Sequence, residues 1–226
     1  MFRFVCILFI LFSFQINAAE KITLANGEWA PYLSQELKHY GYLSHIVTEA
    51  FAEEGIEVEY AFLPWKRGFV EAQQGRHDGS LVWGYNKERA ESFVYSDVVA
   101  ELGTSLFHQK GKDIKLEKPE DLKNYHIGGV IGYAYGVEDL EKKGDVTIDR
   151  IGSAIGNYRK LAAGRIDIVL EDTEAGYSII NKYGLQDKIV ASPAVLHSRN
   201  YHLIISKKTP KADELILAFN RGLKKL

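Results

Sequence analysis

The chain has 226 residues, of which 46% are hydrophobic and 26% are charged, and its formal net charge is −2. This is the composition of a globular protein with enough apolar material for one or two cores. The near-neutral charge argues against a nucleic-acid-binding protein, which usually carries a basic face or stripe.

The first predicted element is a cleavable export signal at residues 1–19. Arg3 precedes a short apolar stretch over residues 4–14, and Ala18 and Ala19 provide small residues for a cleavage site. The stretch is shorter than a typical membrane-spanning helix, so an uncleaved anchor is the less favoured alternative. We therefore expect a periplasmic protein.

The only cysteine, Cys6, lies within this signal. After cleavage the chain would have no thiol, which excludes disulfides, thiolate metal sites and a cysteine nucleophile. The seven histidines show no spacing typical of a metal site, and the sequence has no nucleophile-elbow motif. We expect neither a metal nor a cofactor.

Strands and helices alternate through the first half of the remaining chain. Hydrophobic patterns and capping residues predict, in chain order, a strand at 21–26, a helix at 44–54, a strand at 56–63, a helix at 64–74, a strand at 78–83 and a helix at 87–92. Ser44 is the predicted cap of the first helix, Pro64 suits the first turn of the second, and Asn86 caps the third.

The alternation restarts in the second half. The predicted elements are a strand at 124–132, a helix at 134–144, a strand at 146–151, a helix at 154–164, a strand at 165–172, a helix at 173–184, strands at 188–195 and 201–208, and a helix at 211–226. Strands that alternate with helices of this length predict an α/β protein with mostly parallel sheets flanked by helices.

Two extended stretches predict that the molecule has two lobes. The first lies near residues 104–107, and the second spans residues 194–206. We expect both to cross between the lobes, so that lobe 1 comprises residues 20–104 and 199–226, and lobe 2 comprises residues 105–198. Two lobes joined by two crossing strands can hinge around whatever lies between them.

The three tryptophans are candidates for a binding cleft. Trp29, Trp65 and Trp83 each lie where a predicted strand gives way to a turn or helix. The carboxyl ends of strands in open α/β sheets are where ligands bind, and aromatic walls are typical of small-molecule clefts. Core packing is the alternative for each tryptophan, and it is less favoured for the three together.

Two arginines are candidates for binding an anion. Arg67 and Arg89 lie in the first turn of their predicted helices. A cation there opposes the positive end of the helix dipole, unless an anion neutralises both. A guanidinium offers a planar, bidentate fork that suits a carboxylate. The alternative is a surface ion pair, for Arg89 with Glu88 or Glu91.

The second half contributes a glycine-rich loop and a pair of acids. The loop at 128–136 lacks the spacing of a dinucleotide-binding motif, but backbone amides at residues 133–135 could contact an anionic group. Glu171 and Asp172 end a predicted strand, where they would repel each other unless a cation or a helix N-terminus were near. Asp172 therefore either caps the following helix or binds a ligand ammonium, and both alternatives stay open.

Four stretches, EWAPY, GRHDGSLVWGYNKERAESFVYSD, GGVIGYAYG and LAAGRIDIVLEDTEA, occur in an order that resembles family 3 of the bacterial extracellular solute-binding proteins. These are the periplasmic amino-acid-binding receptors of ABC importers. The resemblance covers residues 21–226, and the segment LPWKR is similar to a divergent branch with a PWKR motif. It implies the two-lobed type II periplasmic-binding-protein fold, which closes on its ligand.

The resemblance also implies ligand contacts. Trp29 matches the aromatic residue that covers the amino acid, and Asn26 matches a nearby polar contact. Arg89 matches the arginine that holds the α-carboxylate, and Asp172 matches the acid that receives the α-ammonium. The start of a second-lobe helix that also meets the carboxylate is matched by Tyr133, Ala134 and Tyr135.

The sequence departs from the family just before the arginine, where small hydroxyl residues are usual. Here the chain has Trp83, Gly84 and Tyr85, which indicates a bulkier and more aromatic pocket. The complete set of expected ligand-binding residues is Asn26, Trp29, Trp65, Arg67, Trp83, Gly84, Tyr85, Arg89, Tyr133, Ala134, Tyr135 and Asp172.

These observations predict a monomeric periplasmic receptor that captures an amino-acid-like zwitterion between its lobes, without chemistry, and delivers it to an inner-membrane ABC permease. One alternative is a ligand sensor that has no role in transport. Another is an enzyme on the same fold that resembles the cyclohexadienyl dehydratases, with Glu171 as a general acid. The sequence indicates no other catalytic residue.

Overall fold

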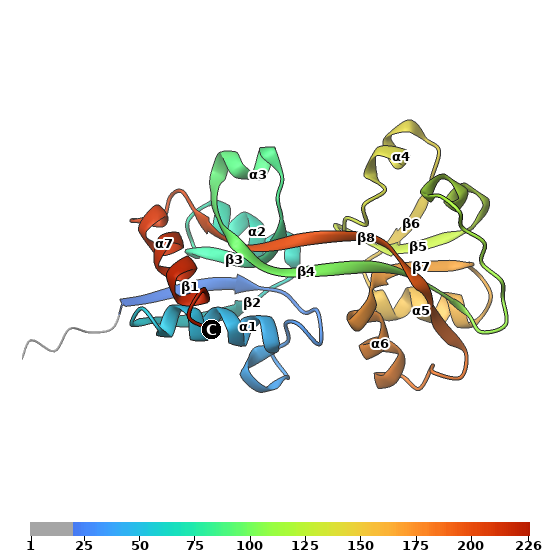
Figure 1. Cartoon of the computed structure of the whole chain (residues 1–226), viewed down its shortest axis with the longest axis horizontal. Coiled ribbons are helices and arrows are strands. Elements are labelled where there is room, and N and C mark those ends of the chain that lie inside the picture. Colours follow the sequence, from blue (N-terminus) through green and yellow to red (C-terminus); the bar gives the residue numbers. More distant parts are fainter. Residues whose placement is uncertain (1–19) are drawn as a thin grey trace, which may run out of the picture.

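The structure, a computed structural model, describes residues 20–226 (Figure 1). The predicted export signal at 1–19 and Cys6 lie outside the described residues. Within residues 20–226, we find no helix with the length and apolar character needed to span a membrane.

Two lobes are joined by two long strands, β4 (Phe93–Gln109) and β8 (Ile189–Ser206) (Figure 1). The first lobe contains β1 (Glu20–Asn26), β2 (Ile56–Phe62), β3 (Gly79–Gly84), α1 (Tyr42–Ala52), α2 (Trp65–Gln73), α3 (Lys87–Ser92), α7 (Ala212–Leu223) and a short 3-10 helix (Lys38–Tyr40). The second lobe contains β5 (Ile127–Val130), β6 (Ile148–Ile151), β7 (Ile168–Asp172), α4 (Glu138–Lys143), α5 (Ala154–Ala162), α6 (Thr173–Lys182) and a 3-10 helix (Pro119–Asn124).

The strands of the described chain form one sheet in the order β2-β1-β3-β8-β4-β7-β5-β6. In the first lobe β1 pairs in parallel with β2 and β3, and in the second lobe β5 pairs in parallel with β6 and β7. The crossing strands are antiparallel to each other and to β3 and β7. This arrangement confirms the predicted α/β fold of two lobes, each with a mostly parallel sheet, joined by two crossing strands.

Each lobe has its own hydrophobic core. In the first lobe Leu24, Phe51 and Phe219 are fully buried between the sheet and helices α1 and α7. In the second lobe Phe107 and Tyr158 are fully buried against β7 and helices α5 and α6. Because apolar burial is the main stabilising contribution to a fold, each core stabilises chiefly its own lobe.

The structure corrects three predicted elements of the second half. The helix predicted at 134–144 begins only at Glu138, because Gly136 has a φ of 84° and the Glu138 carboxylate accepts hydrogen bonds from the amides of Tyr135 and Gly136. The strands predicted at 188–195 and 201–208 are parts of the single strand β8.

The predicted cap at Ser44 is also wrong. Helix α1 already begins at Tyr42, and Ser44 is buried inside it, where its Oγ accepts a hydrogen bond from Asn26 Nδ2 at 3.0 Å. The predicted cap at Asn86 is confirmed, since its Oδ1 accepts from the amides of Glu88 and Arg89 at 2.8 and 3.2 Å.

Candidate functional site

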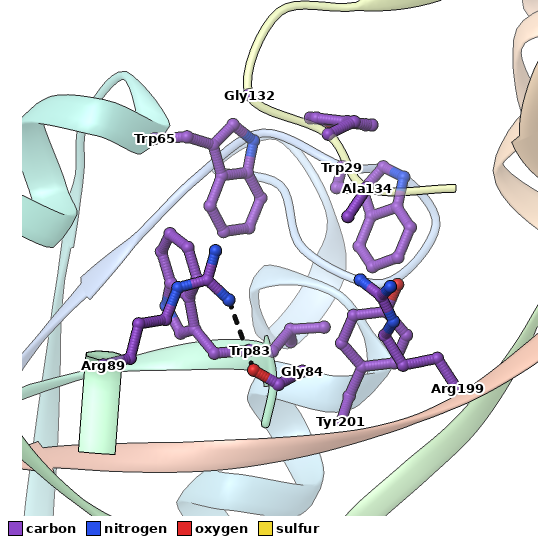
Figure 2. Close-up of a pocket in the computed structure, with 11 residues that line it drawn as sticks. Trp29, Trp65, Trp83, Gly84, Arg89, Gly132, Ala134, Arg199 and Tyr201 are labelled. Atoms are coloured by element: carbon purple, nitrogen blue, oxygen red, sulfur yellow. Dashed lines mark hydrogen bonds between the residues drawn. The ribbon is translucent and has the colours of Figure 1, made fainter. Parts of the chain in front are cut away.

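A cavity opens between the lobes beside the crossing strands (Figure 2). It holds about 540 Å³ of empty space, counting its open mouth. First-lobe and crossing-strand residues form most of its wall, and Gly132, Tyr133 and Ala134 reach it from the second lobe. Both lobes therefore contribute to one site.

All three tryptophans line this cavity. Trp29 follows β1, Trp65 begins α2 directly after β2, and Trp83 lies in β3. These strands are parallel neighbours, so their carboxyl ends meet at one edge of the sheet. The rings of Trp65 and Trp83 meet edge to face with centroids 5.8 Å apart, and Trp29 packs against Tyr201 at 5.7 Å. The structure thus brings the three tryptophans together, as expected.

The orientation of Trp83 depends on an irregularity in β3. The pairing of β3 with β8 shifts register between Ser80 and Trp83, and Val82 has a φ of 61°. A β-branched residue rarely adopts this left-handed conformation, which costs of the order of 1–3 kcal/mol. Beside this bulge Trp83 Nε1 donates to Ser80 Oγ at 2.8 Å. Such strain is concentrated at ligand sites, and here it adjoins the cavity.

Arg89 presents its guanidinium group to the cavity without an acidic partner. The guanidinium carbon lies 4.8 Å from the centroid of the Trp83 ring, and Nη1 donates to the carbonyl of Gly84 at 3.2 Å. Within residues 20–226 Arg89 makes no salt bridge. The alternative of an ion pair with Glu88 or Glu91 is therefore wrong. The remaining N–H groups can bind a ligand oxygen.

Arg199, on β8, is a second cation of the cavity, which the sequence analysis missed. Its Nη2 lies 3.5 Å from Glu138 Oε2, and its side chain is 26% exposed. The structure places it beside Gly84, because a Cβ atom at Gly84 would lie only 2.6 Å from Arg199 Cδ. Gly84 therefore accepts a hydrogen bond from Arg89 through its carbonyl, and it leaves room for Arg199 because it has no side chain.

A signal for Arg199 exists in the sequence. Tyr201 also lines the cavity, and it follows Arg199 by two residues on the same strand. Alternate residues of a strand point to the same face. Residues 194–206 were predicted only as a crossing segment, so none of their side chains was assigned to the cleft.

The second-lobe loop reaches the cavity, but two of its three candidate amides are already paired. Tyr133 and Ala134 line the cavity, but the amide of Tyr133 donates to Val130 O at 3.1 Å and the amide of Tyr135 to Glu138 Oε1 at 2.6 Å. The amides at 133 and 135, expected to meet an anion, are therefore already paired. The Tyr135 side chain is buried in the second-lobe core, where its hydroxyl accepts from the amide of Val130.

Glu171 lies beside a different space. It lines a wider groove of about 1320 Å³ on the other side of Trp29. Its Oε1 accepts from Trp29 Nε1 at 3.3 Å across the lobes and from the amide of Asp172 at 3.0 Å. Burial raises the pKa of Glu171 from 4.5 to about 7 against these bonds, with a further increase from the charge of Asp172.

Asp172 caps helix α6. Its Oδ1 accepts hydrogen bonds from the amides of Glu174 and Ala175 at 3.0 and 3.1 Å, and from the hydroxyl of Tyr32 in the first lobe. Burial raises its pKa. Of the two alternatives open for Asp172, the structure shows the cap. The carboxylate does not line the cavity that contains Arg89.

Three other expected ligand residues also lie away from the cavity. Asn26 is buried, and its amide group bonds Ser44 and the amide of Gly27. Arg67 is exposed and pairs with Glu71 at 2.8 Å. Tyr85 is 64% exposed and packs on Tyr95, as its place after the strand end allows.

The described part of the chain holds no cluster of three or more histidine, cysteine, aspartate or glutamate side chains that could bind a metal ion. The polar groups around the cavity are instead guanidinium groups, indole N–H groups and tyrosine hydroxyls, which recognise a ligand by hydrogen bonds and charge.

No family model and no curated protein matches the sequence. Solved structures do match it. A histidine kinase sensor domain with similarity to periplasmic binding proteins has a TM-score of 0.77 and 22% identity, over 92% of this chain and 91% of that chain. An ancestral arginine-binding protein bound to arginine has a TM-score of 0.75 and 19% identity, over 91% of each chain. The substrate-binding protein of an amino acid ABC transporter has a TM-score of 0.71 and 19% identity, over 91% of this chain and 92% of that chain.

At these identities the similarity defines the fold. The chain has the type II periplasmic-binding-protein fold, in agreement with the resemblance to the family 3 solute-binding proteins. What the site binds has to be argued from its own residues, since one fold serves many functions.

Proposed function

We propose that this chain is a periplasmic solute-binding protein that captures a small carboxylate-bearing solute between its lobes for ABC-type import. The observation that carries the proposal is the unpaired guanidinium group of Arg89 in an aromatic cavity built from both lobes. A cation that is partly removed from water and lacks a counter-ion favours an anionic ligand group. The amino-acid-like zwitterion expected from the sequence is one member of this class.

Capture would work by closure of the lobes around the crossing strands β4 and β8. Three contacts link the lobes beside the cavity: Trp29 with Glu171, Tyr32 with Asp172, and the ring of Trp29 with that of Tyr133 at 6.2 Å. A solute that contacts both walls binds the closed form more tightly than the open form. That difference in affinity shifts the population towards closure.

A thermal-shift screen tests this proposal. We expect carboxylate-bearing solutes to raise the unfolding midpoint of the mature protein, because a ligand that binds only the folded state stabilises it. Amines and neutral sugars of similar size serve as controls and should have no effect. If only solutes without a carboxylate stabilise the protein, the role proposed for Arg89 is wrong.

A sensor role is the second candidate, and the similarity to a histidine kinase sensor domain favours it. Transport and sensing use the same binding step, so they differ only in the partner that recognises the closed form. Uptake of a radiolabelled ligand distinguishes them. Deletion of the gene should abolish high-affinity uptake if the protein serves a permease, and should leave uptake unchanged if it serves a sensor.

An enzyme of the dehydratase type is the third candidate, favoured by the raised pKa of Glu171, which keeps a proton available near neutral pH. Against it, Glu171 lines the wider groove and not the cavity that holds Arg89. Incubation with prephenate or arogenate would release an aromatic product from an enzyme of this type. We expect none, as for a binding protein.

A further inference from the structure

The free polar groups of the cavity are mainly hydrogen-bond donors. Arg89 and Arg199 lie on either side of Gly84 (Figure 2). Trp65 also lines the cavity, and the hydroxyl of Tyr133 lies close to its buried Nε1. The indole N–H groups of Trp29 and Trp83 already have acceptors, in Glu171 and Ser80. A ligand therefore needs acceptor groups at more than one place.

The charged side chains at the cavity have a net positive charge. The carboxylate of Glu138 lies beside Arg199, and only its Oε2 faces the guanidinium group, 3.5 Å from Nη2. Its other oxygen accepts from the amides of Tyr135 and Gly136. Arg89 makes no salt bridge with any described residue. Two guanidinium groups against one shared carboxylate favour an anionic ligand.

Among the described residues, the cavity offers no unpaired carboxylate for an ammonium group, because Glu138 already faces Arg199 at 3.5 Å. Asp172 is engaged by the hydroxyl of Tyr32 and by two helix amides. Glu171 lines the wider groove, whereas Trp29 and Tyr133 line both spaces. An α-ammonium group placed beside Arg89 and Arg199 would lose part of its hydration and would have to compete with Arg199 for Glu138, which is costly.

Flat aromatic side chains form the rest of the wall. Trp29, Trp65, Trp83, Tyr133 and Tyr201 all line the cavity. Their side chains can stack on a planar ligand or meet its edge, and such aromatic pairs contribute beyond the area that they bury. The apolar part of the ligand should therefore be a flat ring.

From these four observations we propose that the cavity binds an aromatic carboxylate that carries a second acceptor group on its ring and no ammonium group. Arg89 binds the carboxylate, and Arg199 binds the second acceptor and so determines specificity. This inference rests on the proposed capture function and narrows its ligand from a general carboxylate, or a zwitterion, to this class.

The test is calorimetric titration of the mature protein with a matched set of probes: benzene-1,4-dicarboxylate, 4-hydroxybenzoate, benzoate, phenylalanine and benzylamine. We expect the dicarboxylate and the hydroxybenzoate to bind at least about tenfold more tightly than benzoate, because each adds a charge-assisted hydrogen bond to Arg199. Phenylalanine should bind more weakly than benzoate, and benzylamine should not bind.

Two variants separate the role of Arg199 from a general effect on the protein. Arg199→Gln should remove the preference for the second acceptor, so that the dicarboxylate and benzoate bind with affinities within about threefold. Arg199→Lys keeps the charge without the planar fork and should retain part of the preference. The matched control is Arg67→Gln, which changes an arginine outside the cavity and should alter no affinity.

The outcomes distinguish this inference from the capture function. If phenylalanine or another amino acid binds most tightly, and Arg89→Ala weakens that binding, the capture function stands and the inference is wrong. An unchanged preference for the dicarboxylate in both Arg199 variants also overturns the inference. If none of these probes and no amino acid binds, both the inference and the capture function fail.

Discussion

Among single residues, Gly84 has a specific structural role, which is to leave space for the side chain of Arg199. A Cβ atom at this position would lie 2.6 Å from Arg199 Cδ. We expect Gly84→Ala to displace the Arg199 side chain and to weaken binding of the ligand about tenfold. The cost in folding free energy should stay within about 1–3 kcal/mol, since the far part of a flexible side chain can move.

Calorimetric titration and chemical denaturation measure the two effects of Gly84→Ala. The matched control is Gly152→Ala, where a Cβ atom would meet open space. Wild-type affinity in Gly84→Ala would show that the close approach of Arg199 is not needed for binding.

Glu171 should make stability depend on pH. Its pKa is raised to about 7 in the folded protein from 4.5. Between these values the folded state binds more protons than the unfolded state, so the free energy of unfolding falls as the pH rises from about 4.5 to about 7. The difference between the two pKa values corresponds to about 3 kcal/mol.

Urea denaturation at several pH values between 4.5 and 8 measures this effect. Glu171→Gln should lose less stability than the wild type over the same range, because glutamine does not ionise. The exposed residue Glu91 provides the control Glu91→Gln. Parallel pH profiles for the wild type and Glu171→Gln would contradict the assignment.

Residue chemistry explains which parts of the site the sequence predicted. Arg89 and the three tryptophans follow strand ends, and a general rule of α/β sheets places such residues at a cleft. The sequence position of Asp172 suits both a helix cap and an ammonium ligand. Only the positions of Tyr32 and of the α6 amides decide between these two roles. Arg199 and Tyr201 share one strand face in the sequence, but the register of β3 on β8, which places Gly84 opposite Tyr201, is needed to place that face at the cleft.

At the scale of elements, helix α7 depends on a close contact with α1. A Cβ atom at Gly222 would lie 1.8 Å from the backbone oxygen of Ala50. Backbone cannot move aside as a flexible side chain can, so Gly222→Ala should separate the two helices and destabilise the first lobe by about 1–3 kcal/mol or more. Thermal denaturation measures the loss, and Gly152→Ala again provides the control.

This prediction also tests the anchoring of β8. Helix α7 follows β8 directly and packs its buried residues, among them Phe219, on α1. If Gly222→Ala leaves the unfolding midpoint unchanged, the contact between α1 and α7 is looser than the structure indicates.

Most elements followed from local sequence signals, and the exceptions have physical causes. The period of the hydrophobic residues and the caps located nearly every helix. The helix expected at 134–144 failed because Gly136 and the side chain of Glu138 stabilise a loop. The length of β8 could not be predicted, since a strand of 18 residues exists only because β4 pairs with it almost throughout.

At the scale of the whole molecule, alternating strands and helices with two extended crossing stretches predicted the two-lobed fold, and the strand order confirms it. The lobe boundaries at 104/105 and 198/199 stay predictions, because they fall within β4 and β8, which run without a break from one lobe to the other (Figure 1). The relative position of the lobes could not be predicted, as it depends on contacts such as that between Trp29 and Glu171.

The most direct test is the affinity of Arg89→Ala for a carboxylate, measured by calorimetric titration. The ligand is the carboxylate that stabilises the wild type most in the thermal-shift screen, and Arg67→Ala is the control. Removing one partner of a buried charged contact costs about 2–5 kcal/mol. We therefore expect Arg89→Ala to bind at least about 30-fold more weakly and Arg67→Ala to bind as the wild type does. Equal affinity in Arg89→Ala and the wild type would contradict the claim that this cavity captures a carboxylate.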